Sequence, residues 1–145
     1  MKLTRQQMEA EMEFHQLALG CCLKRRRLAL HLAQEEFAER CHVSRAEVQH
    51  AEHARHGLRD PTRLCFCLGL GITEIELVAE VEREKQAWAI QGFPRDVEVP
   101  KSLAEKLAAI GAEMKADKTP PPCPSVMTPA LLYAWMRAIG STQGR

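Results

Sequence analysis

The chain has 145 residues, of which 46% are hydrophobic and 27% are charged, and its formal net charge is +1. These values are close to those of ordinary globular domains and exclude a wholly disordered chain. The N-terminal residues are polar and charged and lack the apolar run of a signal peptide or membrane span, so we expect a cytoplasmic protein with no membrane segment. The six cysteines lack the even spacing of a small secreted scaffold, which predicts reduced thiols.

Charge is distributed unevenly along the chain. Residues 19–63 contain nine Lys and Arg against six Asp and Glu, whereas residues 64–92 contain two basic residues against five glutamates. All six histidines lie between positions 15 and 56. A basic zone therefore adjoins an acidic one, and an anionic partner would suit the basic zone.

Helix signals dominate the sequence, and only residues 96–100 alternate in the manner of a strand. We therefore expect an all-α fold. Thr4 and Gln7 have capping-box spacing, which predicts a long helix from about Arg5, with an interruption at Gly20 left open.

Two short helices are predicted after this long one. The first spans residues 34–40, and the second is capped by Ser44 and runs to about His53. Their spacing places Phe37, Ala38, Val48 and Ala51 inward. Only three residues separate the two helices.

Two further helices are predicted between residues 60 and 92. Asp60 and Pro61 supply the cap and first turn of one, with Leu64, Phe66, Leu68 and Leu70 expected to provide core. A longer helix is expected from Thr73 to near Gly92, with Ile75, Val78, Val81 and Trp88 roughly on one side.

The C-terminal region is predicted to hold two more helices. Ser102 is expected to cap one whose apolar positions are Leu103, Leu107, Ile110 and Met114, and Thr128 is expected to cap one that ends at Gly140. Between them, residues 118–125 are proline-rich and predict a stiff connector. We thus expect a domain over residues 1–77 and a helical region over residues 78–145, the latter for dimerisation or partner binding.

The stretch LGCCLKRRRLALHLAQEEFAERCHVSRAEVQHAEH, followed by LGLGITEIEL, resembles the Cro/CI-type (XRE-like) helix-turn-helix domain of bacterial and phage repressors. The resemblance covers about residues 19–77 and needs no gap. Its matching positions are Leu23, Arg27, Gln34, Phe37, Ala38, Val43, Ser44, Val48, Glu52, Leu70, Gly71 and Ile72. It implies a lambda-repressor-like helical bundle that carries a C-terminal helical extension.

The same resemblance implies a set of site residues. Base edges would be faced by Arg45, Ala46, Gln49 and His50, with Ser44 as cap and Glu47 nearby. Gln34 matches a position that contacts the DNA backbone or supports the recognition helix. Arg27 and Glu52 match a buried or semi-buried ion pair that ties the first helix to the recognition helix.

Elementary chemistry supports this interpretation of the basic zone. Arg pairs with guanine and Gln with adenine in the major groove, each pair contributing on the order of 1–3 kcal/mol of base discrimination. Phosphates are expected to contact Lys24, Arg25, Arg26, Arg55 and Arg59. The alternative is that these cations form an ordinary solvated helix face.

Three departures from the family pattern affect local structure. Ala33 replaces the Ser or Thr that caps the second helix, His42 replaces the turn glycine, and Ala54 replaces the glycine that ends the recognition helix. A lost cap costs about 1 kcal/mol. A left-handed non-glycine residue costs roughly 1–2 kcal/mol. We therefore expect a reshaped turn after the recognition helix, near Arg55 and His56.

No arrangement of residues typical of an enzyme is present, and we expect no cofactor, metal or catalytic residue. The histidines at 50, 53 and 56 and the nearby cysteines lack a metal-ligand spacing such as CxxC or HxxxH. Cys41, Cys65 and Cys67 are interpreted as small core residues.

The sequence thus predicts a DNA-binding transcriptional regulator that acts as a homodimer on a pseudo-palindromic operator. The family resemblance implies that this regulator is a repressor. The dimer contact is expected in the acidic helix 73–91 or in the last helix. Two alternatives stay open: an antitoxin or phage-type adaptor whose C-terminal region binds another protein, and a helix-turn-helix scaffold that no longer binds DNA.

Overall fold

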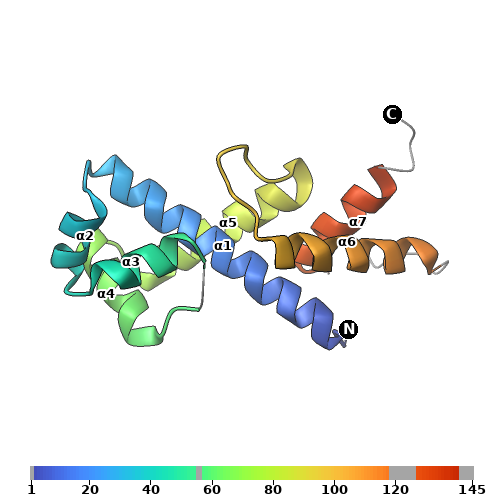
Figure 1. The fold of residues 1–145 in the computed structure, drawn as a ribbon, viewed down its shortest axis with the longest axis horizontal. Coiled ribbons are helices and arrows are strands. Elements are labelled where there is room, and N and C mark those ends of the chain that lie inside the picture. Colours follow the sequence, from blue (N-terminus) through green and yellow to red (C-terminus); the bar gives the residue numbers. More distant parts are fainter. Residues whose placement is uncertain (1, 55–56, 118–126, 141–145) are drawn as a thin grey trace. The chain divides into compact units, whose positions relative to one another are not determined.

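The computed structural model describes residues 2–54, 57–117 and 127–140 (Figure 1). These residues form helices α1 (Arg5–Ala29), α2 (Gln34–Cys41), α3 (Arg45–Glu52), α4 (Asp60–Leu70), α5 (Glu74–Gln91), α6 (Lys101–Ala116) and α7 (Pro129–Gly140). The described ranges contain no strand, so the all-α class is confirmed. None of their helices is both long and apolar enough to cross a bilayer. The connector at 118–125, Arg55 and His56 lie outside the described residues.

The chain divides into two compact units. The central unit contains His15–Glu84, and the terminal unit combines the segment that ends at Phe14 with the residues from Lys85 onward. Both unit boundaries fall inside helices, because α1 and α5 each contribute to both units. The N-terminal segment therefore groups with the C-terminal region, which differs from the expected division at residue 77.

Helix α1 begins where the sequence predicts. The Gln7 N–H donates to Thr4 Oγ1 (3.1 Å) and the Thr4 N–H donates to Gln7 Oε1 (3.0 Å), which completes the capping box. The helix continues through Gly20 without interruption. A Cβ at Gly20 would collide with the backbone oxygen of Ala51, so this glycine permits close packing of α1 on α3.

The core of the central unit is built on two aromatic rings. Phe37 of α2 and Phe66 of α4 stack with centroids 5.6 Å apart and an interplanar angle of 10°. Gly69 of α4 approaches Cys41 of α2 so closely that a Cβ would collide with the sulfur. Helix α2 thus packs against both α3 and α4 (Figure 1). Leu23, Val48, Leu77 and Val81 are also fully buried.

Several core assignments in α4 and α5 are wrong. Leu64 and Leu68 are 44% and 70% exposed, whereas Phe66 and Cys67 are buried as predicted. In α5, Val81 and Trp88 are buried as predicted. Ile75 and Val78 are 82% and 48% exposed, and Leu77 is buried in their place. Helix α5 carries two apolar stripes at helical spacing, and tertiary packing selects the one that contains Leu77.

The terminal unit has an aromatic core. Phe14, Trp88, Phe93 and Tyr133 lie with neighbouring ring centroids 4.7–6.0 Å apart. These edge-to-face and tilted arrangements are the ones that aromatic rings favour. Leu103, Leu107 and Ile110 of α6 are buried as predicted, and α6 packs along α7.

The predicted caps of α6 and α7 are wrong. Helix α6 begins at Lys101 after Pro100, and the Ser102 hydroxyl donates to Glu13 (2.9 Å) instead of capping. Thr128 Oγ1 is buried and makes no hydrogen bond with any described residue. Instead, Glu11 of α1 accepts a hydrogen bond from the Ala130 N–H (3.2 Å). A carboxylate thus satisfies a free donor at the start of α7, where the helix dipole also favours negative charge.

Candidate functional site

Helix α3 begins at the predicted serine. Ser44 Oγ accepts a hydrogen bond from the Glu47 N–H (3.1 Å) and donates to Glu47 Oε1 (3.3 Å). One of the free backbone donors of the first turn is therefore satisfied, and the Glu47 side chain is held at the cap. Arg45 and Ala46, the first two residues of α3, remain exposed.

The two sides of α3 differ in character. Val48 and Ala51 are buried against the rest of the central unit. Residues four apart share a side of a helix, so Arg45 lies with Gln49 and Ala46 lies with His50. Gln49 and His50 are half-buried. These four residues, Arg45, Ala46, Gln49 and His50, are called the outer face of α3 below.

A buried ion pair fixes the C-terminal end of α3 to α1. Arg27 Nε donates to Glu52 Oε2 (2.6 Å) and Arg27 Nη2 donates to Glu52 Oε1 (2.9 Å). The two side chains are only 8% and 2% exposed. Arg27 Nη1 also donates to the Leu32 carbonyl oxygen (2.8 Å). The predicted Arg27–Glu52 tether is confirmed.

Helix α2 joins the same network through its first residue. Gln34 Nε2 donates to Glu52 Oε1 (3.2 Å), so a single carboxylate connects α1, α2 and α3. Of the two roles expected for Gln34, the support of α3 is the one observed. A network of this kind restricts the angle at which α3 is presented, since each partner would lose its hydrogen bonds if the helix rotated.

Two residues that stand where the family has glycine lie in the turns around α3, and the turn expected to be reshaped near residues 55–56 lies outside the described residues. His42 and Ala54 have φ values of 57° and 54°, in the left-handed region that favours glycine. His31 is left-handed as well (φ 59°), which the sequence analysis did not anticipate. Ala33 offers no side-chain cap to α2, but the Glu36 carboxylate accepts a hydrogen bond from the Ala33 N–H (3.1 Å). This bond satisfies the N–H of Ala33 itself, whereas the first-turn N–H that a Ser or Thr side chain would cap gains no side-chain acceptor from Ala33.

The basic residues fall into two groups. Arg25 makes two hydrogen bonds of 3.1 Å to Glu84, and Arg26 pairs with Glu80. The hydrogen bond to Glu84 also raises the pKa of Arg25. These two arginines are engaged with α5, which counts against their expected role as phosphate contacts. Lys24, Arg40, Arg45 and Arg59 are exposed and form no ion pair within the described ranges.

Family models, curated proteins and solved structures yield no match to this chain. The functional assignment therefore depends on the geometry of α3 and its supports. That geometry presents a guanidinium, an amide and an imidazole on one side of a capped helix. Such groups suit the recognition of hydrogen-bonding edges on an anionic polymer.

Of the described cysteines, Cys22, Cys41 and Cys67 are buried, whereas Cys21 and Cys65 are half-buried. Burial, with a smaller contribution from Glu80, raises the pKa of Cys22 to about 12. Burial likewise raises the pKa of Cys41 to about 11 and that of Cys67 above its usual value. Their thiols are therefore protonated near neutral pH and are poor nucleophiles. Within the described part of the chain, no three potential ligands gather as a metal site.

Two supports of the site were missed from the sequence. Gly20 allows α1 to approach α3, and the Leu32 carbonyl fixes one end of the Arg27 guanidinium. The Gly20 contact joins segments that are distant along the chain, so no local pattern could have indicated it. Arg55, one of the predicted DNA contacts, lies outside the described residues.

Proposed function

We propose that the central unit binds double-stranded DNA and that the outer face of α3 contacts base edges in the major groove. The observation that carries this proposal is the way α3 is held, capped by Ser44 at one end and tied through Glu52 to α1 and α2 at the other. Residues 34–52 would then be a helix-turn-helix of the lambda-repressor type, with α3 as recognition helix.

Each group on the outer face has a chemical counterpart on DNA. The Arg45 guanidinium matches O6 and N7 of guanine, and the Gln49 amide matches N6 and N7 of adenine. The Ala46 methyl group suits the methyl group of thymine, and His50 offers a ring nitrogen to a base or phosphate. Gln34, Ser44 and Glu47 would act by holding α3 in place, as their contacts with Glu52 and with each other suggest.

Phosphates would be contacted by the basic side chains that form no ion pair within the described ranges. Lys24, Arg40 and Arg59 are exposed and form no ion pair in the described ranges, so they are free to neutralise phosphates. Arg25 and Arg26 would first have to leave their glutamates. Such contacts add affinity without sequence information.

The protein would act as a homodimeric transcriptional regulator. An α3 of eight residues spans few base pairs, and two-fold symmetry places two such helices about 34 Å apart in successive major grooves. Of the two predicted dimer contacts, α5 is favoured, because Ile75 and Val78 are exposed. Leu131 and Leu132 of α7 are instead buried within the terminal unit.

Selection from a random duplex pool tests this proposal with the full chain. Enriched sequences should contain two related half-sites with a two-fold axis between them, about one helical turn apart. Selection that enriches no sequence would contradict the proposal and favour the adaptor interpretation.

Light scattering tests the dimer contact. Ile75→Glu should halve the mass of the particle, because a buried carboxylate is costly at an apolar interface. Ile90→Glu is the matched control, since Ile90 is also exposed and lies on the same helix. A dimer that survives Ile75→Glu would refute the assignment of this face.

A further inference from the structure

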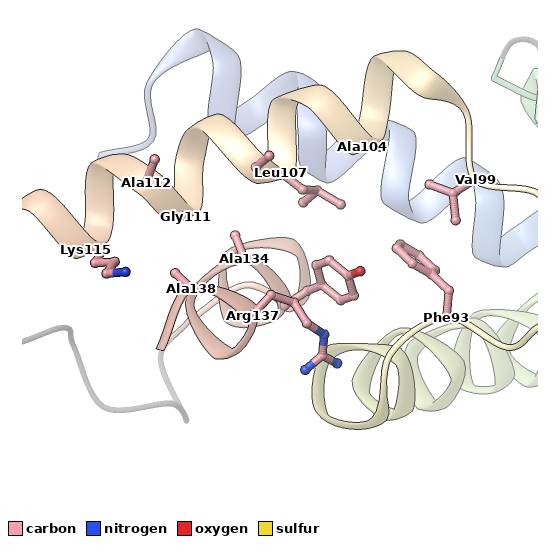
Figure 2. A pocket seen from close by; sticks show the side chains of 12 residues that line it. Phe93, Val99, Ala104, Leu107, Gly111, Ala112, Lys115, Ala134, Arg137 and Ala138 are labelled. Carbon is pink, nitrogen blue, oxygen red and sulfur yellow. The ribbon is translucent and has the colours of Figure 1, made fainter. Parts of the chain in front are cut away.

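The terminal unit contains an apolar pocket between α6 and α7. Its volume is about 510 Å³, within the range of roughly 300–1,000 Å³ typical of small-molecule sites. Figure 2 shows Leu107 and Ala112 of α6 lining it across from Ala134 and Ala138 of α7, with Phe93 at one end. The sequence analysis did not anticipate this pocket.

Small residues create the space. A Cβ at Gly111 would lie 2.8 Å from the Ala134 carbonyl oxygen, so the glycine lets the two helices approach closely at one point. Beside this contact several wall positions carry only the methyl group of an alanine, among them Ala108 and Ala112, which leaves the neighbouring volume unfilled. Phe93 and Tyr133, with ring centroids 4.7 Å apart, supply a firm aromatic wall.

The charged side chains that line the pocket are all positive. Lys115 and Arg137 both line it, and no Asp or Glu is among its described lining residues. The Arg137 guanidinium lies over the Tyr133 ring, 4.8 Å from its centroid, and Nη2 donates to the Ile90 carbonyl oxygen (3.3 Å). No carboxylate of the described chain pairs with Arg137.

The contact with Ile90 gives Arg137 a structural role, since it caps a free carbonyl near the end of α5. That single bond leaves most of its N–H donors unassigned, because a guanidinium carries several in a fixed planar fork. The ring of Tyr133 and the backbone of α5 hold this fork in a defined position. A positioned guanidinium beside an apolar cavity favours a bidentate carboxylate whose remaining atoms are apolar.

We infer that this pocket binds a small apolar carboxylate, of the class of medium-chain fatty acids and arylalkanoic acids. The carboxylate pairs with Arg137, and Lys115 adds a second positive charge at the wall. The hydrocarbon part lies between the alanine-lined helices and contacts Phe93 and Tyr133. This inference does not depend on DNA binding, and its test is made without DNA.

Calorimetric titration of the full chain with octanoate and with 1-octanol tests the inference. The two probes share the same hydrocarbon chain and differ in the carboxylate. Octanoate should bind at one site per chain and more tightly than 1-octanol, because only octanoate can pair with the guanidinium. Equal affinity for the two probes, or no binding of octanoate, would overturn the inference.

Three variants locate the site. Arg137→Gln should raise the Kd of octanoate by at least about tenfold, since it removes a charge-assisted pair, and should leave 1-octanol nearly unchanged. Ala108→Phe should abolish binding of both probes, because the ring fills the pocket from an exposed position. Lys101→Gln is the control, since it removes an exposed cation of α6 that does not line the pocket.

Folding and oligomeric state are measured for each variant by thermal unfolding and light scattering. Unchanged binding by both Arg137→Gln and Ala108→Phe would contradict the proposed site. A loss of oligomeric mass in Ala108→Phe would also contradict it, because the occupant would then be a second copy of the chain.

Discussion

Arg27 and Glu52 form a buried ion pair in which Arg27 Nε and Nη2 each donate a hydrogen bond to one oxygen of the Glu52 carboxylate. The two side chains are 8% and 2% exposed. The pair joins the long helix α1 to the last residue of α3. A buried ion pair of this kind adds little net stability, because desolvation of the two charges offsets their attraction. Its effect is on geometry, since a single arrangement satisfies both partners and Gln34.

Removal of either Arg27 or Glu52 should therefore lower the stability of the folded protein. Glu52→Ala leaves a buried guanidinium without its counter-charge and should lower the free energy of unfolding by about 3–5 kcal/mol, measured in urea. The double variant Arg27→Met/Glu52→Leu should recover most of that loss, because it removes both charges. Arg5→Ala is the exposed control and should change stability little. A small effect of Glu52→Ala would show that the tether does not hold α3.

Gly20→Ala should reverse the usual effect of this substitution. In a helix interior, alanine is normally more favourable than glycine by roughly 0.5–1 kcal/mol. Here the added methyl group would collide with the Ala51 backbone, so we expect a loss of about 1–3 kcal/mol in unfolding free energy. Gly140→Ala is the control, because no described residue lies within 4 Å of its added methyl group. Stabilisation by Gly20→Ala would contradict the close contact of α1 with α3.

Cys22 should make stability depend on pH in the alkaline range. Its pKa is raised from 9.0 to about 12, so the folded state holds the thiol proton more tightly than the unfolded state does. The resulting stability is complete below about pH 9 and is lost as pH rises toward 12. Cys22→Ala should remove this part of the alkaline loss in urea unfolding measured from pH 7 upward. Rapid alkylation of Cys22 in the folded protein at neutral pH would contradict its assignment.

Unpaired basic residues should contact DNA phosphates, and basic residues paired with a glutamate should not. Lys24→Ala should weaken DNA binding and reduce the slope of log K against log salt by about 1, because one released counterion is lost. Arg25→Ala should leave the slope nearly unchanged, since Arg25 is paired with Glu84. The two residues are adjacent in α1, which makes the comparison a close one. The reverse order of effects would show that the Arg25–Glu84 pair opens on DNA.

Local signals predicted the starts of α1 and α3 and the buried sides of α2 and α3. Ser44, the Thr4–Gln7 box and the spacing of Phe37 and Val48 act within one or two turns, so the sequence displays them directly. The Arg27–Glu52 tether was predicted through the family resemblance, and the structure contains it.

Contacts between residues far apart in the sequence, and the choice of which helix face is buried, could not be predicted in the same way. Helix α5 has two apolar stripes, and only packing decides that Leu77 is buried while Ile75 is exposed. The pairing of Arg25 with Glu84 joins residues 59 positions apart, and Glu11 reaches α7 across 119 positions. The space in the pocket of the terminal unit is created by alanines and a glycine, which carry no chemical signature in a sequence.

The central claim is tested most directly by fluorescence anisotropy with a selected duplex and with a scrambled duplex of the same composition. Arg45→Ala and Gln49→Ala should each cost about 1–3 kcal/mol of preference for the selected duplex, with folding retained. Arg45→Lys should keep most of the affinity for both duplexes but lose much of the preference, because lysine cannot form the planar bidentate pair. Unchanged sequence preference in all three variants would contradict the assignment of the outer face of α3 to DNA recognition.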